Sequence, residues 1–480
     1  MKTKLKLSVM ALVAISMTGC FGTDSNDSSN NTNNDTNADN ISNTDTDDNT
    51  VDPDVIDVVE CSTPATATTE SQKAKVYSFT SQTGDESSVS YSGQVTRQVL
   101  LQEFINKIKG LANPGAVALT EADLLAYFDD RDETLQANIE LLPGDFELAN
   151  DVVLISDLNG SKNILGKTSG ASFIDNSEDF QGKTAISAVN SWITELVANS
   201  QTSKLGTKEV FLDSKNRDLS QLIDKVLLGA ISYDQAANNY LADIGDNTAP
   251  QQKNDVDEAH TEAEHHWDEA FGYFGAARDY PSYSDDALAG KNGESPYKDS
   301  DGDSKIDLKS EYNFGISKNA GKRDRIGCQV NLTQDAFDGF YLGRKALSEG
   351  KSAESAEVQD AASAALIAWE KTIAATALHY VNDVLADQAS FDADDQSEYS
   401  ILDHAKHWSE LKGFSIALQY NDSRIISAAE LKELHSYIGS APVSAANNSE
   451  EAIKATQDLI AARELLGQVY GFSAYNVQNW

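Results

Sequence analysis

The sequence predicts a mainly α-helical protein, organised as a duplicated helical bundle with a long loop between the two halves. Apolar residues recur at the three- and four-residue spacing of a helix face over most of the chain after residue 90. Proline is scarce, with 8 in 480 residues. A tetrapeptide of the pattern His-Trp-x-Glu occurs at residues 266–269 and again at 407–410. Histidine and tryptophan are both rare in this chain, so the repeat indicates an internal duplication.

The first twenty residues have the pattern of a secretory signal sequence. Three lysines precede an apolar run at residues 7–17, and the tetrapeptide that ends at Cys20 resembles the processing site of bacterial lipoproteins. The apolar run is shorter than the roughly 20 residues that cross a bilayer, which argues against a transmembrane anchor. We therefore expect Cys20 to be lipidated and to become the first mature residue. Phe21 favours an outer-membrane lipoprotein that faces the periplasm or the cell surface.

Residues 21–60 predict a disordered acidic linker. They consist mainly of Asn, Asp, Ser and Thr, with eleven acids and no Lys or Arg. Such a segment cannot bury enough apolar surface to offset the entropy lost on ordering. The formal net charge of the whole chain is −39, which argues against nucleic acid or an anionic membrane surface as a partner. The membrane contact that we expect is the N-terminal lipid.

The helical pattern begins shortly after the linker. Residues 75–81 alternate in polarity and predict a short strand. Ser92 and Thr120 then stand at the expected starts of two helices. Further helices are predicted at 184–200, 218–244, 254–276, 331–349, 353–389, 400–419, 427–439 and 449–469.

These helices fall into two halves, each with one copy of the motif. The N-terminal half is 61–276, the C-terminal half is 331–480, and the loop at 277–330 between them is rich in Gly, Ser, Asp and Lys. Cys61 and Cys328 are the two cysteines left after lipidation. In an oxidising compartment we expect them to form a disulfide that ties the start of the domain to its middle. Two unpaired buried thiols are the alternative.

The repeated motif points to metal chemistry. Helix positions i, i+4 and i+7 share one face, so an acid, the histidine and the glutamate of each copy line one stripe. We expect the two stripes to face each other and to bind a divalent transition metal, iron or zinc. The candidate ligands are His266, Glu269, His407 and Glu410, with Glu262 and Asp403 as further ligands or as groups that orient the imidazoles. The alternative is structural: each histidine pairs with its own acids and each tryptophan packs in the core.

An acidic segment in the loop has the spacing of a calcium site. Its acids stand at positions 1, 3, 5 and 9 of an EF-hand-like loop, and position 7 offers a backbone carbonyl. Two departures are Ser304, where glycine is usual, and Ser310, where the bidentate acid is usual. The alternative is an acidic surface turn. We expect calcium to be bound by Asp299, Asp301, Asp303, Lys305, Asp307 and Glu311.

A basic segment follows the acidic one and contains Lys318, Lys322, Arg323, Asp324 and Arg325. We expect its cations to pair with the acids of the calcium loop, and binding of an anion is the alternative. The chain has no Gly-x-Ser-x-Gly, no His-Glu-x-x-His and no phosphate-binding loop, and neither Cys61 nor Cys328 has a protease signature. These absences favour a protein without enzymatic activity.

Two families resemble this chain. The segments 87–94, 266–275 and 310–315 are similar to a bacterial lipoprotein family known as the domain of unknown function numbered 4856, over roughly residues 75–480. More distantly, the His-x-x-Glu element on a helix resembles the imelysin-like iron-regulated proteins. The resemblance implies export, an imelysin-like bundle and a link to metal uptake. It implies metal ligation at both His-x-x-Glu elements and no established activity.

Three functions follow from these observations. The first is a lipoprotein that binds iron or zinc between the motif helices and calcium in the acidic loop, with a role in metal uptake. The second is a metal-dependent hydrolase with Glu269 or Glu410 as the base. The third is a calcium-stabilised interaction or scaffold protein in which the motif helices only pack.

Overall fold

The structure is a computed structural model that describes residues 61, 69–81, 87–128, 147–160, 162–253, 256–391, 399–444 and 449–480. The predicted signal sequence, the lipidation site Cys20 and the linker 21–60 lie outside the described residues. Within these ranges, none of the helices combines the length and the apolar character needed to cross a membrane.

Helices dominate the described chain, which confirms the mainly helical fold class and the helical bundle. The longer helices are α2 (Ser92–Lys109), α5 (Ala185–Ser200), α7 (Glu262–Phe274), α10 (Leu332–Ser348), α11 (Ala356–Ala389), α12 (Ile401–Ala417), α13 (Ala428–Ile438) and α14 (Glu450–Tyr470). The shorter ones are α1 (Glu70–Lys73), α3 (Glu121–Phe128), α4 (Ser156–Asn159), α6 (Leu219–Leu227), α8 (Asp285–Ala289), α9 (Gly315–Asp324) and α15 (Ala474–Asn479).

Among the described residues, four short strands accompany the helices. The strand β1 (Glu147–Leu148) pairs in parallel with β4 (Lys305–Ile306). The strands β2 (Pro250–Lys253) and β3 (Val256–Thr261) form an antiparallel pair. The first pair connects the N-terminal half to the segment that carries the predicted calcium site.

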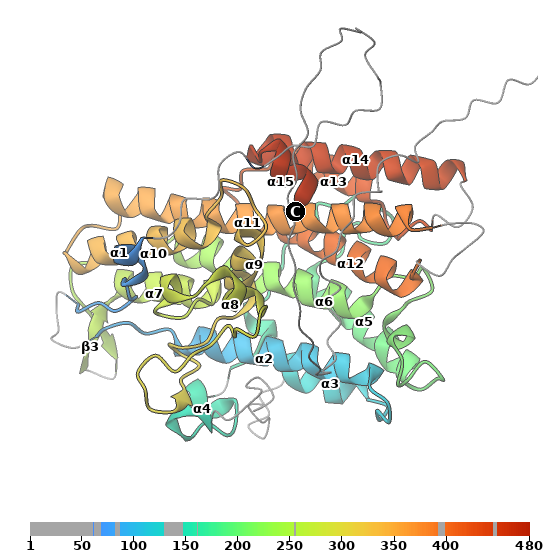
Figure 1. The fold of residues 1–480 in the computed structure, drawn as a ribbon. Coiled ribbons are helices and arrows are strands. Elements are labelled where there is room, and N and C mark those ends of the chain that lie inside the picture. Colours follow the sequence, from blue (N-terminus) through green and yellow to red (C-terminus); the bar gives the residue numbers. More distant parts are fainter. Residues whose placement is uncertain are drawn as a thin grey trace, which may run out of the picture. The chain divides into compact units, whose positions relative to one another are not determined.

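The longest helix, α11, runs through the centre of the bundle. It packs against α9, α10, α12 and α14, and Figure 1 shows it between α14 and α12. Its many alanines allow close approach: a Cβ added at Gly339 of α10 would lie only 2.6 Å from the backbone nitrogen of Ala365. Trp369 of α11 is almost fully buried in the same core.

One long helical segment supports both motif helices. The helix α6 continues into two π-helical segments, Leu228–Tyr233 and Gln235–Tyr240. The first motif helix, α7, packs against the second π-helical segment, and the second motif helix, α12, packs mainly against α6. At about 1.5 Å per residue, these two contact regions lie roughly 20 Å apart along the supporting helix. Figure 1 accordingly shows α7 and α12 at different ends of this segment.

Three predicted elements differ from the structure. Residues 75–81 have buried alternate side chains, but they pack on helices and form no assigned strand. The helix predicted at 254–276 begins as β3, because Thr261 and Glu264 form a capping box that starts α7 only at residue 262. The loop at 277–330 contains the helices α8 and α9.

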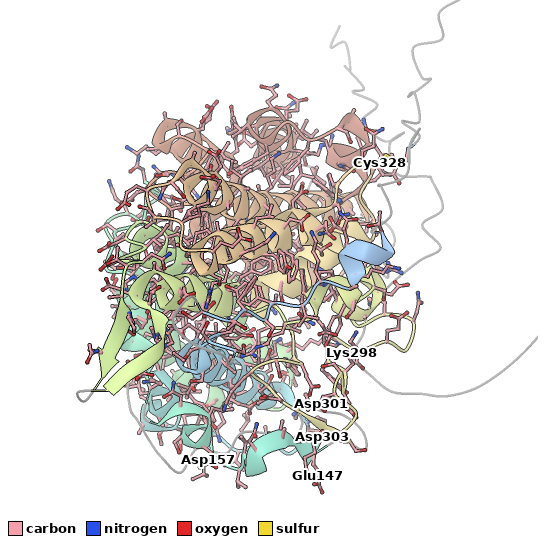
Figure 2. All side chains as sticks on the ribbon, turned by 90° about the vertical axis from the view of Figure 1, so that its left-hand side faces the viewer. Glu147, Asp157, Lys298, Asp301, Asp303 and Cys328 are labelled. Carbon is pink, nitrogen blue, oxygen red and sulfur yellow. A yellow bond between two sulfur atoms is a disulfide. The ribbon has the colours of Figure 1, made fainter. Side chains whose placement is uncertain are left out.

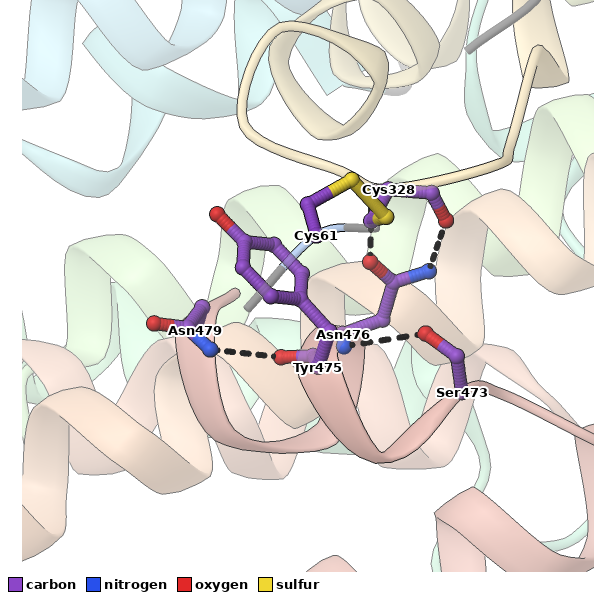
Figure 3. Close-up of a disulfide and its surroundings, with 6 residues drawn as sticks. All are labelled: Cys61, Cys328, Ser473, Tyr475, Asn476 and Asn479. Atoms are coloured by element: carbon purple, nitrogen blue, oxygen red, sulfur yellow. Dashed lines mark hydrogen bonds between the residues drawn. A yellow bond between two sulfur atoms is a disulfide. The ribbon is translucent and has the colours of Figure 1, made fainter. Parts of the chain in front are cut away.

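The disulfide joins Cys61 to Cys328, with a Cα–Cα distance of 5.7 Å. Figure 3 shows how Cys328 is held from its other side by Asn476 of α15. The Asn476 side chain accepts from the Cys328 backbone N–H at 2.6 Å and donates to the Cys328 carbonyl at 2.9 Å. The bridge therefore fastens residue 61 to the end of the α9 region and to the C-terminal helix.

Candidate metal sites

The predicted calcium loop brings three of its acids together. One carboxylate oxygen each from Asp299, Asp301 and Asp303 lies within 4.8 Å of the other two. Among the described residues, this is the one group of three or more acidic, histidine or cysteine side chains close enough to share an ion. Asp301 and Asp303 are exposed (Figure 2), so an ion could enter from solvent.

The backbone of this loop turns as a calcium loop does, despite its serine. The Asp299 carboxylate accepts hydrogen bonds from the backbone N–H groups of Gly302, Asp303 and Ser304, at 2.6, 3.1 and 2.9 Å. Ser304 has a φ of +67°, the left-handed conformation for which glycine is usual at this position. The departure at Ser304 therefore does not prevent the turn.

The other three predicted calcium ligands, Lys305, Asp307 and Glu311, take part in other contacts of the loop. Lys305 lies in β4 and pairs with β1. Asp307 accepts from the backbone N–H of residue 309 at 2.9 Å. Glu311 is only 3% exposed. Its Oε1 accepts from the backbone N–H of Ser300 at 2.7 Å, and its Oε2 from that of Asp307 at 2.8 Å. Glu311 therefore holds the loop together from inside.

In the first motif, each predicted ligand already has a partner. His266 Nδ1 lies 2.8 Å from the backbone oxygen of Asp243. Glu262 accepts from a backbone N–H of the preceding loop at 3.0 Å. Glu269 accepts from the side-chain amide of Gln94 on α2 at 2.7 Å.

The first motif helix, α7, also contributes to a buried ion cluster that the sequence did not predict. Arg344 of α10 donates to Glu264 and to Asp268, both at 2.9 Å, and all three side chains are fully buried. Tyr77 also donates to Asp268 at 2.9 Å. Burial raises the pKa of Asp268, and the Arg344 charge opposes that rise. A signal was available: Glu264 and Asp268 stand four residues apart on one helix face, and acids on a buried face need a cation.

The second motif has acidic side chains around its histidine. His407 Nδ1 lies 2.8 Å from a carboxylate oxygen of Asp387. Burial opposes protonation of His407, but the hydrogen bond and charge of Asp387 outweigh it and raise the pKa of the imidazole. Glu410 accepts from the Tyr380 hydroxyl at 2.9 Å. Asp403 lies in the first turn of α12, where its backbone N–H donates to the capping serine.

The two copies have similar aromatic neighbours in different ring orientations. The rings of Tyr240 and His266 lie 5.6 Å apart, edge to face, and those of Tyr380 and His407 lie 6.2 Å apart and are stacked. In each copy the motif tryptophan donates its indole N–H to a backbone carbonyl, at 2.8 Å for Trp267 and 3.1 Å in the second copy. The motif thus has a common packing role in the two halves.

The expected shared metal centre is not formed. Among the described residues, no group of three potential ligands includes His266, Glu269, His407 or Glu410. The supporting helix helps to separate the motifs, since α12 packs mainly against α6 and α7 mainly against Gln235–Tyr240, although both also contact Leu228–Tyr233. Glu262 lies in the first turn of α7 and Asp403 in the first turn of α12. In the described structure these side chains belong to two separate polar sites, and transition-metal binding at the two motifs stays a prediction.

The basic segment also differs from expectation. Arg325 pairs with Asp286 of α8, and Asp324 accepts from the backbone N–H groups of Leu332 and Thr333, both at 2.8 Å. Arg323 is buried, whereas Lys318 is half-buried and Lys322 is exposed. The expected pairing with the calcium-loop acids is not formed among the described residues.

A family model described as Domain of unknown function (DUF4856) matches residues 74–434. The chain belongs to this family. The matched range includes both histidine motifs, the calcium loop and the Arg344 cluster. No curated protein and no solved structure matches this chain.

Proposed function

We propose that this member of the DUF4856 family is an exported lipoprotein whose helical body is stabilised by calcium bound in the loop 299–311. The observation that carries the calcium proposal is the convergence of the Asp299, Asp301 and Asp303 carboxylates. Export and lipidation rest on the signal pattern and on Cys20. An extracellular calcium concentration in the millimolar range would fill even a weak site.

The charges within the loop support a bound cation. The backbone N–H of Asp303 favours the ionised form of Asp301, but desolvation, together with the charges of Asp303, Glu311 and Asp299, outweighs it and raises the pKa of Asp301. Carboxylates that disfavour each other's charge are stabilised when a divalent ion binds between them.

The contacts of the loop explain how calcium could stabilise the whole body. The strand β4 follows the acidic turn and pairs with β1 of the N-terminal half. On the other side, Phe314 donates its backbone N–H to the carbonyl of Gly275, at the end of α7, at 2.7 Å. An ion that rigidifies the loop therefore strengthens the connection between these segments.

Calcium titration of the purified chain tests this proposal. At ten times the dissociation constant, binding to the folded state alone raises the free energy of unfolding by about 1.4 kcal/mol, so calcium should raise the melting temperature. The double variant D301N/D303N should lose this response. The control variant D360N/E451Q removes the same charge from exposed helix positions and should keep it. The proposal would be contradicted if 10 mM calcium did not change the melting temperature of the unmodified chain. It would also be contradicted if calcium had no more effect than magnesium alone.

Lipidation is tested separately. Labelling of cells with a radioactive or clickable palmitate should mark the protein, and Cys20→Ser should abolish both the label and recovery in the outer-membrane fraction. Labelled C20S protein would exclude Cys20 as the site.

The other functions have less support. Transition-metal uptake and metal-dependent hydrolysis were both predicted from a centre that the two motifs would share, and that centre is not formed among the described residues. The matching surroundings of the two motifs still support a duplicated, imelysin-like origin of the two halves. Elemental analysis of protein purified without chelators tests for iron or zinc directly.

A further inference from the structure

A fully buried lysine and a fully buried aspartate lie in direct contact. Lys412 of α12 and Asp175, in the segment before α5, are both 0% exposed. The Lys412 Nζ atom lies 2.5 Å from Asp175 Oδ2, yet this oxygen has no hydrogen-bond partner among the described residues. The amine nitrogen and the carboxyl group are therefore in close contact without the geometry of a hydrogen bond.

The surroundings of the pair keep both side chains in place. Lys412 Nζ donates to the backbone carbonyl of Gly439, just after α13, at 2.7 Å, and it lies 4.7 Å from the centre of the Phe180 ring. The backbone N–H of Ile174 donates to the Gln419 side chain at 2.9 Å, which fixes the chain beside the aspartate. Because the two reacting groups are already held together, little entropy is lost in bringing them into contact.

Burial disfavours the charged forms of both groups. A buried ion pair loses the solvation of two ions, whereas transfer of one proton from the ammonium to the carboxylate leaves a neutral amine and a neutral acid. While Lys412 is protonated, burial raises the pKa of Asp175, but the neighbouring cation outweighs burial and lowers that pKa. The reaction of these groups therefore begins with the proton transfer, since only the neutral amine is a nucleophile.

A histidine without hydrogen bonds lies beside the pair. His435 of α13 is 1% exposed, and its Nδ1 atom lies 3.8 Å from Asp175 Oδ2. Neither of its ring nitrogens has a hydrogen-bond partner in the part of the chain that the structure describes. Burial lowers the pKa of His435 to about 3, so the imidazole is neutral and can take up a proton.

The second oxygen of the carboxyl group has a different neighbour. The backbone N–H of Ser177 donates to Asp175 Oδ1 at 2.8 Å. A donor in this position stabilises negative charge that develops on Oδ1 when a nucleophile attacks the carboxyl carbon. Attack, proton transfer and charge stabilisation thus each have a group in place.

We propose that Lys412 and Asp175 join spontaneously through an amide bond between their side chains. The neutral Nζ attacks the carboxyl carbon of Asp175, and His435 takes a proton from the nitrogen and gives it to Oδ2, which leaves as water. One C–N bond forms, one C–O bond breaks and one water molecule is released, so no oxidant or cofactor is required. The product ties α12 to the segment before α5, as a second covalent bridge besides the Cys61–Cys328 disulfide.

Peptide mapping of the reduced and denatured wild-type chain tests the proposal. The digest should contain a branched peptide that joins Lys412 to Asp175 and is lighter than its two parts by the mass of one water molecule. Lys215 and Asp179 provide a control within the same chain, because their Nζ–Oδ2 distance is also 2.5 Å but the Lys215 side chain is 43% exposed. Water keeps this second pair charged, so it should be recovered in unbranched peptides.

The variant H435F tests the proton transfer, since it keeps the lysine and the aspartate. After a pulse of cell-free synthesis, H435F should form the branched peptide at least about tenfold more slowly than the wild-type chain. The control K215M should form it at the wild-type rate, and circular dichroism checks that both variants are folded.

Two outcomes would count against the amide bond and its mechanism. The proposal is overturned if the folded wild-type chain yields only unbranched peptides that contain free Lys412 and free Asp175. The role of His435 is overturned if folded H435F forms the branched peptide as fast as the wild-type chain. If H435F does not fold, the peptide map of the wild-type chain still decides whether the bond exists.

Discussion

The two copies of the His-Trp-x-Glu motif share their packing and differ in their charges. In both, the tryptophan is buried with its indole N–H on a backbone carbonyl, and a tyrosine ring lies beside the histidine. The position after the tryptophan differs: Asp268 enters a fully buried ion cluster, whereas Ser409 is uncharged and accepts from the backbone N–H of Asp218 at 2.8 Å.

This difference shows that a repeated motif can preserve a helix-packing role without preserving a site. The first histidine, His266, meets a backbone carbonyl. The second, His407, meets the carboxylate of Asp387. The histidine therefore has a charged partner in the second copy and a neutral one in the first.

Exchange of the differing residue gives the largest expected effect. Asp268→Ser, which installs the residue of the second copy, leaves the buried Arg344 with one carboxylate fewer and should lower the free energy of unfolding by about 3–5 kcal/mol. Ser409→Ala should cost only about 1 kcal/mol, the value of one lost hydrogen bond. Urea denaturation of both variants checks this. Equal losses in the two variants would mean that the copies do not differ in the proposed way.

Substitution of the motif glycines tests the tight helix packing that the two copies have in common. A Cβ at Gly272 would lie 2.8 Å from Tyr91 Cβ, and one at Gly413 would lie 2.6 Å from Lys225 Cβ. Gly272→Ala and Gly413→Ala should therefore each lower the free energy of unfolding by about 1–3 kcal/mol through overpacking. The control Gly110→Ala has no atom within 4 Å of the added Cβ and should be close to neutral. A neutral G413A would show that α12 is not held as tightly as α7.

The smallest effect should be a pH dependence confined to the second copy. Because the folded pKa of His407 is raised, the stability from its contact with Asp387 is complete below the unfolded value of about 6.5 and is lost as the pH rises through the folded pKa. The stability difference between the unmodified chain and Asp387→Asn should therefore shrink from pH 6 to pH 9, by under about 1 kcal/mol. Asp360→Asn serves as the control. A stability difference that stays constant from pH 6 to pH 9 would contradict the predicted contribution of the His407–Asp387 ion pair.

Local sequence signals anticipated most of the helices and part of the calcium loop. The helix predicted at 331–349 is α10 at 332–348, and that at 400–419 is α12 at 401–417, because apolar periodicity and capping residues act over a few residues. The acids of the calcium loop also converge locally, since Asp299, Asp301 and Asp303 share one turn. The family was predicted from short segments, and the match at residues 74–434 confirms it.

The arrangement of distant segments was decided by the tertiary structure alone. Periodicity shows which face of a helix is buried, but not which helix covers it. The sequence could therefore not reveal that α7 and α12 pack mainly on different parts of one widened helix, or that Arg344 pairs with acids of the first motif helix. Nor could it reveal that Arg323 of α9 is buried and not paired with the acidic loop that precedes it. Contacts of this kind depend on how the whole core closes, and a charge pattern along the chain does not specify them.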